Sequence, residues 1–154
     1  MEIIKIPNKI LAKTTEKVGL KDIKNGSFKK LVLDMKKSMI DNHGIGLAAN
    51  QVNKDLSIFV IDEKLAIDNN VPEVFFNPEI TEYSREKDEI GEGCLSIPGY
   101  EANIKRSKKI KIKAIDENGK KVKFKARGFL ARVFQHETDH LNGLLIKDRF
   151  NEQR

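Results

Sequence analysis

The sequence predicts an α+β fold, with antiparallel β-sheets and a hairpin packed around a central helix. Short runs of β-branched and aromatic residues fill the middle of the chain. Helical spacing of apolar residues occurs near the start and again near the end. The 154 residues are enough to bury one core, so we expect a single domain over residues 1–154.

The first long helix is expected after the turn Asn25-Gly26-Ser27, where Ser27 is a suitable N-cap. From Phe28 onward apolar residues recur at helical spacing, which predicts an amphipathic helix ending near Asn42. Gly44-Ile45-Gly46 follows as a loop with little steric restriction.

Two strands are expected in the middle of the chain. Residues 57–61 (SIFVI) form a β-branched and aromatic run typical of a buried strand. Val74 to Asn77 predicts another, closed by Pro78. Residues 62–73, between them, look like an irregular polar insertion, and the sequence assigns them no role.

A β-hairpin is expected further on. Residues 109–116 alternate cleanly between lysines and apolar side chains, Asn118-Gly119 supplies the turn, and residues 120–126 return with the same alternation. The apolar positions should face inward and the lysines outward.

The net charge of +6 is concentrated in this region. Residues 105–127 hold eleven lysines and arginines against two acidic residues. The simplest interpretation is a solvated face whose lysines discourage edge pairing. The alternative is a weak electrostatic contact with RNA, although the outward positions lack the aromatic side chains typical of single-strand binders.

Composition predicts a cytoplasmic protein without a membrane partner. Hydrophobic residues make up 39% and charged residues 34% of the chain. No apolar run approaches the ~20 residues that span a bilayer. The N-terminus also lacks the features of a signal peptide.

The last helix is expected from Gly128 to about Leu141, with Asn142-Gly143 as its stop. His136 and His140 are four residues apart and therefore share a face, with Glu137 beside the first of them. This HExxH spacing is typical of two metal ligands and a base. The alternative is a surface helix with two incidental histidines.

A catalytic metal site usually has three protein ligands and one open position. The remaining candidates are His43 and Cys94, the single cysteine. Cys94 lies in Gly91–Pro98 (GEGCLSIP), where glycines allow close backbone approach. A lone cysteine can instead be a small buried apolar residue, but a thiolate here would complete a three-ligand site.

Three motifs together closely resemble the peptide deformylase family. Residues 44–51 (GIGLAANQ) fit the family's GxGxAAxQ, residues 92–96 are its EGCLS, and residues 135–140 (QHETDH) fit its QHExDH. The similarity extends to Ile6-Pro7-Asn8, Asn77-Pro78 and the hairpin, and so covers most of the chain.

The resemblance implies a catalytic domain that removes the formyl group from N-formylmethionyl nascent peptides and releases formate. Cys94, His136 and His140 would bind one divalent metal ion, ferrous iron in this family, with zinc, nickel or cobalt as replacements. Metal-bound hydroxide would attack the formyl carbon, with Glu137 as general base and acid. The Gln51 amide and the Leu95 N–H would stabilise the oxyanion.

The resemblance also implies an extended substrate between the Gly44–Gly46 loop and Gly93. Substrate-binding residues would be Ile45, Gly46, Ile90, Gly93, Phe129 and Val133, with His136 at the methionine pocket. Core packing is the alternative for Ile90, Phe129 and Val133. We expect Arg132 at the rim with its charge in water. Arg106 would either support the Cys94 loop or be a surface charge.

Two other functions stay open on the sequence. HExxH alone also fits a zinc peptidase, but after His140 only Asp148 and Glu152 remain as a further ligand. The lysine-rich hairpin fits an RNA-binding module. We expect a monomer with transient ribosome contact through residues 105–127. Because the chain stops at Arg154, docking through a C-terminal helical extension, as in longer family members, is not expected.

Overall fold

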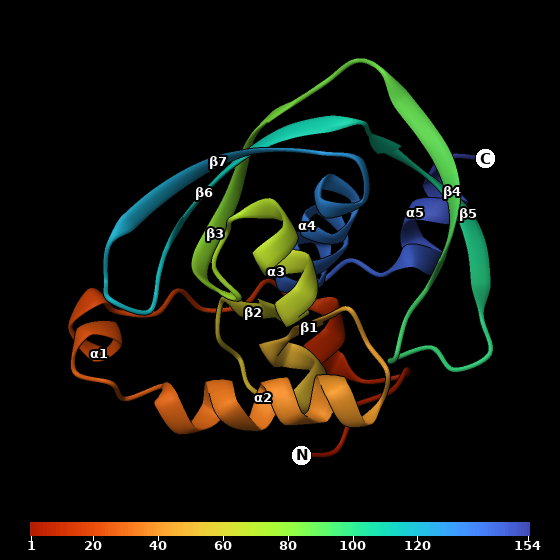
Figure 1. Ribbon diagram of the computed structural model, residues 1–154. Coiled ribbons are helices and arrows are strands. Elements are labelled where there is room, and N and C mark those ends of the chain that lie inside the picture. Colours follow the sequence, from red (N-terminus) through yellow and green to blue (C-terminus); the bar gives the residue numbers. More distant parts are fainter.

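A five-stranded antiparallel sheet in the order β1-β2-β3-β6-β7 forms the centre of the computed structural model, which describes residues 1–154 (Figure 1). Its strands are β1 (Gly46–Ala48), β2 (Ile58–Ile61), β3 (Val74–Tyr83), β6 (Lys109–Ile115) and β7 (Lys121–Arg127). A separate two-stranded ribbon pairs β4 (Lys87–Gly93) with β5 (Glu101–Ser107).

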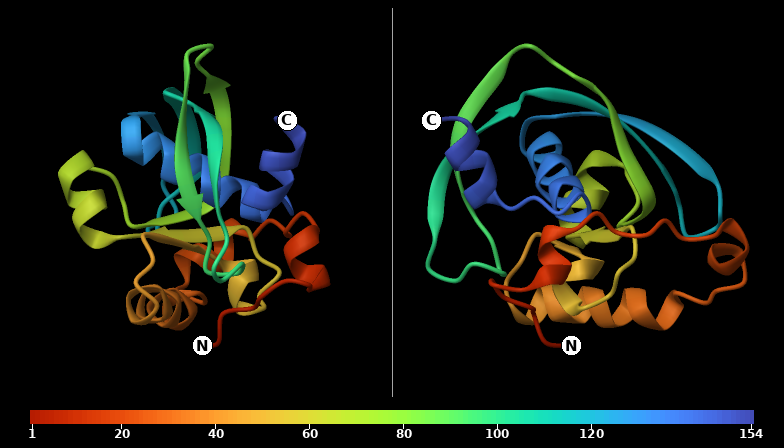
Figure 2. Two further views of the ribbon diagram at one scale, coloured as in Figure 1. Left: turned by 90° about the vertical axis from the view of Figure 1, so that its right-hand side faces the viewer. Right: turned by 180° about the vertical axis from the view of Figure 1, so that it is seen from behind.

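The helices are α1 (Leu20–Lys24), α2 (Lys29–Asp41), α3 (Glu63–Asn69), α4 (Gly128–Leu141) and α5 (Ile146–Glu152), with short 3-10 helices η1 (Lys9–Ala12) and η2 (Ala49–Val52). Figures 1 and 2 show α4 in the middle of the molecule, under an arch of strands. Helix α5 packs against β5 on the outer side. None of the helices combines the length and apolar character needed to cross a bilayer.

At β2 the sheet is buried on both faces, which explains the continuous apolar run of that strand, whereas β6 and β7 expose every second residue. On one face Phe59, Phe75 and Phe134 of α4 form an aromatic cluster with ring centroids 4.9 to 5.9 Å apart. On the other face, Met35 and Met39 of α2 join the apolar cluster beneath the sheet. Helix α4 is therefore held by the main core along its length.

A long bent ribbon carries the chain from the sheet to the site. β3 pairs with β6, and their continuations β4 and β5 pair with each other. At the bend, the Ser107 hydroxyl donates to the Ser84 carbonyl at 2.9 Å. The Gln135 side chain of α4 accepts from Ser107 N at 3.1 Å and donates to Ser107 O at 2.9 Å. The bend is thus tied to the central helix.

The predicted fold class is confirmed, since helices and antiparallel sheets surround α4. The predicted amphipathic helix is α2, the hairpin is β6–β7, and the predicted last helix coincides with α4. The inward-facing positions Ile110, Ile112 and Ala126 are buried as expected.

Three local predictions were wrong. Residue Phe28, rather than Ser27, is the N-cap of α2, and Ser27 instead bonds the Asn25 side chain. The segment 62–73 contains α3, whose N-cap Asp62 accepts from Leu65 N at 3.1 Å. β3 continues through Pro78 because the strand register shifts between Phe76 and Glu79. A proline at such a bulge removes no ladder hydrogen bond.

The sequence also missed β4, β5 and α5. The strand β4 (KDEIGEG) is charged and contains glycines, so it shows little of the composition typical of strands. Its pairing with β5 depends on contacts that a local pattern does not reveal.

Candidate active site

Helix α4 and the turn after β4 bring three metal-ligating side chains together. The Cys94 Sγ lies 3.4 Å from His140 Nε2, and the two histidine Nε2 atoms are 3.3 Å apart. All three ligand atoms lie within 4.8 Å of one another. Two nitrogens bound to one tetrahedral ion at ~2.0 Å each would be separated by about 3.3 Å. The donor set therefore fits a single ion.

The zinc-peptidase alternative required a ligand from the end of the chain. Asp148 instead accepts from Leu145 N at 2.8 Å, at the start of α5. Glu152 lies 3.5 Å from the Arg149 guanidinium. Neither carboxylate belongs to the cluster of potential ligands, whose third member is the Cys94 thiol.

The orientation of His136 is set by Glu92 of β4. The carboxylate Oε1 lies 2.8 Å from His136 Nδ1, which leaves Nε2 facing the cluster. Burial opposes ionisation of Glu92, but hydrogen bonds from His136 and Arg106 outweigh it and lower the pKa of Glu92 to about 2. The charged carboxylate can therefore accept a hydrogen bond from Nδ1 at any physiological pH.

The two imidazoles have different environments. Burial opposes protonation of His136, but its hydrogen bonds to Cys94 and Glu92 outweigh burial and raise its pKa to about 10. Burial, followed by the nearby His136 charge, lowers the pKa of His140 well below its ordinary value. A metal ion would compete with the His136 proton for Nε2.

Glu137 is a buried carboxylate beside this cluster. Its Oε2 lies 4.0 Å from His136 Nε2, and its Oε1 has no hydrogen-bond partner. Burial raises the pKa of Glu137 to about 7. A carboxyl group with that pKa can both take up and release a proton near neutral pH.

The Gln51 side chain, from η2, is held with its amide nitrogen toward the cluster. Its Oε1 accepts from Ala48 N at 3.0 Å, while Nε2 donates to Ser96 Oγ at 3.1 Å and lies 3.8 Å from Cys94 Sγ. The Leu95 N–H donates to no backbone carbonyl. Both groups are thus available as donors near the same thiol.

A cavity of about 1000 Å³ opens beside these residues. It is lined by Glu137, Gln51, Leu95, Cys94 and His136, and by the expected substrate-binding residues Ile45, Gly46, Ile90, Gly93, Phe129 and Val133. Ile90 and Phe129 are 49% and 58% exposed, so they do not pack into the core. Val133 is buried in the main core and also lines the cavity.

Arg132 was expected at the rim with its charge in water, and that prediction was wrong. It is 6% exposed, and its Nη1 donates to Glu92 Oε2 at 2.5 Å and to Ile104 O at 2.9 Å. Its Nη2 donates to Asp88 at 2.8 Å. The two acidic partners come from β4, a strand the sequence did not reveal.

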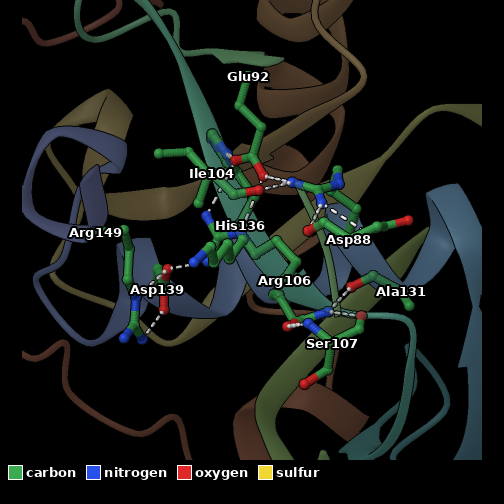
Figure 3. Close-up of polar contacts among 12 residues, drawn as sticks. Asp88, Glu92, Ile104, Arg106, Ser107, Ala131, His136, Asp139 and Arg149 are labelled. Carbon is green, nitrogen blue, oxygen red and sulfur yellow. Dashed lines mark hydrogen bonds and ion pairs between the residues drawn. The ribbon is translucent and has the colours of Figure 1, made fainter. Parts of the chain in front are cut away.

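Arg106 is also buried, and it bridges two carboxylates (Figure 3). Its Nε and Nη2 each donate to Glu92 at 3.0 Å, and its Nη1 donates to Asp139 at 2.5 Å. Of the two roles considered from the sequence, Arg106 thus supports the region of Cys94, through Glu92, rather than being a surface charge.

Sequence reasoning assigned no role to four residues that organise the site, Glu92, Ser96, Gln135 and Asp139. All four lie within the two motifs that contain the expected metal ligands, residues 92–96 and 135–140. Their location in these motifs was the one feature of the sequence that could have indicated a role at the site. Their roles depend on partners from other segments, which the motifs do not contain.

Comparison with known proteins gives a consistent result. The family model for polypeptide deformylases matches residues 1–154. A peptide deformylase of Dictyoglomus turgidum is 47% identical, over 99% of this chain and 94% of that protein.

Solved structures agree with the sequence relatives. A class I type b peptide deformylase from Acinetobacter baumannii superimposes with a TM-score of 0.90 at 32% identity, covering 97% of each chain. The Thermotoga maritima enzyme gives 0.87 at 39% identity, covering 97% of this chain and 96% of that one. A further structure of the Acinetobacter enzyme contains Met-Ala-Ser.

Proposed function

The chain belongs to the polypeptide deformylase family, and from this membership and the site geometry we propose how its residues carry out the reaction. It is a metal-dependent hydrolase that removes the N-terminal formyl group from nascent polypeptides. The single observation that carries the residue assignment is the cluster of Cys94, His136 and His140, of which Cys94 and His136 line the same cavity as Glu137.

Cys94, His136 and His140 would hold one divalent ion. When bound, the ion would supply Lewis-acid chemistry, because it lowers the pKa of a water molecule and polarises the formyl oxygen. We propose ferrous iron, with zinc, nickel or cobalt as replacements, since one thiolate and two imidazoles accept each of these metals.

Glu137 moves the proton. The water oxygen bonds to the formyl carbon while the Glu137 carboxylate takes the water's proton. The carbon–nitrogen bond then breaks, and Glu137 returns the proton to the leaving amine nitrogen. A free amine and formic acid result, and the formic acid releases its proton to water as formate. The pKa of about 7, which burial gives this carboxyl, supports both transfers.

Two donors stabilise the negative charge that develops on the formyl oxygen. Gln51 Nε2 is held in place by the Ala48 N–H on its own oxygen and by Ser96 Oγ, and the Leu95 N–H is free of backbone partners. Such preorganised donors reorganise little during the reaction, and removing one typically costs ~3 kcal/mol of transition-state stabilisation.

The cavity supports an extended peptide with an apolar first side chain. Ile45, Ile90 and Phe129 present exposed apolar surface around the cluster, which suits a methionine side chain. The Met-Ala-Ser peptide in the Acinetobacter relative is consistent with a product complex of this kind. We propose that residues 1–154 act as one catalytic domain, as a monomer, in a bacterial-type cytoplasm.

The exposed face of β6 and β7 is the surface we propose for transient ribosome contact. It carries seven exposed cations, Lys109, Lys111, Lys113, Lys121, Lys123, Lys125 and Arg127. Lys111 faces Lys125 and Lys113 faces Lys123 across the two strands. Glu82 and Glu79 of β3 pair with Lys111 and Lys113, at 3.1 and 3.4 Å. Lys123 and Lys125 have no such carboxylate, and an RNA backbone would supply a negative partner for them.

Cosedimentation with ribosomes tests this surface. Binding should weaken as salt rises and with Lys123→Glu, while Lys30→Glu on α2 should bind as the wild type does. Binding that is insensitive to salt and to Lys123→Glu would exclude the proposed contact.

Formate release from formyl-Met-Ala-Ser tests the proposed function directly. The wild type should release formate and leave unformylated Met-Ala-Ser intact. Glu137→Gln should retain the metal, yet lose about 10² to 10⁴-fold in kcat, the usual contribution of a general acid and base. A Glu137→Gln variant with wild-type kcat would contradict the assignment of the proton transfer.

A further inference from the structure

Arg149, on helix α5, lies outside the cavity but is the outer member of an ion-pair chain that ends at the ligand His136. Its Nε and Nη2 form a fork on Asp139, at 3.0 and 2.8 Å. Asp139 accepts from Arg106, Arg106 donates twice to Glu92, and Glu92 contacts His136 Nδ1. Figure 3 shows these ion pairs and hydrogen bonds in one view.

We propose that Arg149 is a positioning residue for the metal ligands, acting through Asp139, Arg106 and Glu92. The inference rests on the proposed ligation of the metal by His136. Arg149 touches neither substrate nor metal in this scheme. It holds Asp139 directly, and it affects Glu92 only through Arg106.

Charge balance gives the first reason. Apart from His136 itself and the exposed Glu152, which lies 3.5 Å from Arg149, the network contains three cations, Arg106, Arg132 and Arg149, and three carboxylates, Asp88, Glu92 and Asp139. The side chains of Arg106 and Glu92 are 4% and 6% exposed, so water screens them little. Loss of the Arg149 charge would leave this region with one excess negative charge.

The sharing of Arg106 gives the second reason. Arg106 is the one residue that bonds both Glu92 and Asp139. Without Arg149, Asp139 would retain Arg106 as its single cation and attract it more strongly. The two Arg106–Glu92 hydrogen bonds would then lengthen, and Glu92 would hold His136 Nδ1 less firmly. Residues that orient a metal-ligating histidine typically affect metal affinity or activity by 10- to 100-fold.

Helix α5 has anchors that do not involve Arg149. The Gln153 side chain accepts from Lys105 N at 2.9 Å and donates to Lys105 O at 3.1 Å. Ile146 is buried in an apolar cluster with Ile97 and Ile104. Removing the Arg149 charge should therefore leave α5 in place, which separates positioning from simple attachment of the helix.

The experiment compares Arg149→Met with three other variants, using Co²⁺ as the metal probe. Arg149→Lys keeps the charge without the fork, Gln153→Ala loosens α5 without changing charge, and Arg154→Met removes an exposed cation from the chain end. Each variant is measured for Co²⁺ affinity against a chelator, for the visible spectrum of its Co²⁺ form, and for thermal unfolding of the metal-free protein. The kcat and KM for formyl-Met-Ala-Ser complete the set.

Arg149→Met should bind Co²⁺ about tenfold more weakly, with a changed spectrum, a lower kcat and an unchanged KM. Arg149→Lys should recover part of both affinity and kcat. Gln153→Ala should lose thermal stability alone, and Arg154→Met should match the wild type.

Two outcomes would overturn the proposal. One is wild-type Co²⁺ affinity and spectrum in Arg149→Met, and the other is an equal loss of affinity in Gln153→Ala. Failure of the proposed function looks different, because the wild type itself would then bind no Co²⁺ through Cys94 or release no formate.

Discussion

A methyl group on residue 46 would overlap the carboxylate of Glu137. An ideal Cβ built on Gly46 lies 2.7 Å from Glu137 Oε2 and 2.8 Å from its Cδ. Both distances are well below van der Waals contact. The strand β1 can therefore lie against the proposed base only because residue 46 is glycine.

Gly46→Ala should displace Glu137 and reduce kcat by about 10² or more, since a 1 Å misplacement of a reacting group can cost that much. Metal content should stay at the wild-type level, because Cys94 and the histidines are not contacted. Formate release and metal analysis check both points. The control is Gly19→Ala, where an added Cβ would meet its nearest atom at 3.8 Å. Unchanged kcat in Gly46→Ala would show that Glu137 can move without loss of activity.

Glu92→Gln should destabilise the fold because Glu92 accepts from both Arg106 and Arg132 in the interior. Removing one partner of a buried ion pair typically costs about 3–5 kcal/mol in the free energy of unfolding. Denaturant unfolding of the metal-free protein measures this. Glu89→Gln, at an exposed position of the same strand, should change stability by less than ~0.5 kcal/mol. Equal stabilities of the two variants would be evidence against a structural role of the buried network.

Metal removal should abolish activity and lower the midpoint of thermal unfolding. A ligand that binds only the folded state stabilises it by about 4 kcal/mol when the free ligand concentration is a thousand times its dissociation constant. Adding Ni²⁺ or Co²⁺ back to the chelated protein should restore both quantities. In Cys94→Ser the midpoint should no longer respond to metal. A full metal-dependent shift in Cys94→Ser would argue against the thiol as a ligand.

Phe129→Ala should weaken substrate binding without affecting the fold. Phe129 is 58% exposed and lines the cavity, so its apolar surface is free to cover a substrate side chain. Losing that contact should raise KM for formyl-methionyl peptides about tenfold, which corresponds to ~1.4 kcal/mol. Stability should change by less than ~0.5 kcal/mol. Leu33→Ala, 66% exposed on α2, is the matched control and should leave KM unchanged.

The elements predicted correctly are those with long, regular periodicity. Helices α2 and α4 and the hairpin β6–β7 each show it over many residues. The ribbon β4–β5 was missed because both strands are rich in charged residues, β4 also contains glycines, and the two pair across a loop. Arg132 was misplaced because a charge in an apolar helix is normally solvated, and its burial depends on Glu92 and Asp88 of that missed ribbon.

The sequence by itself determined that His136 and His140, two of the proposed ligands, lie side by side, since four residues of α-helix place two side chains on one face. It also placed Glu137 next to them. Only the tertiary structure decided that Cys94, 46 residues away, lies 3.4 Å from His140. The tertiary structure also decided that Glu137 is buried against Gly46 and that Arg149 pairs with Asp139. Helical geometry is local, whereas these contacts depend on how the whole sheet and ribbon pack around α4.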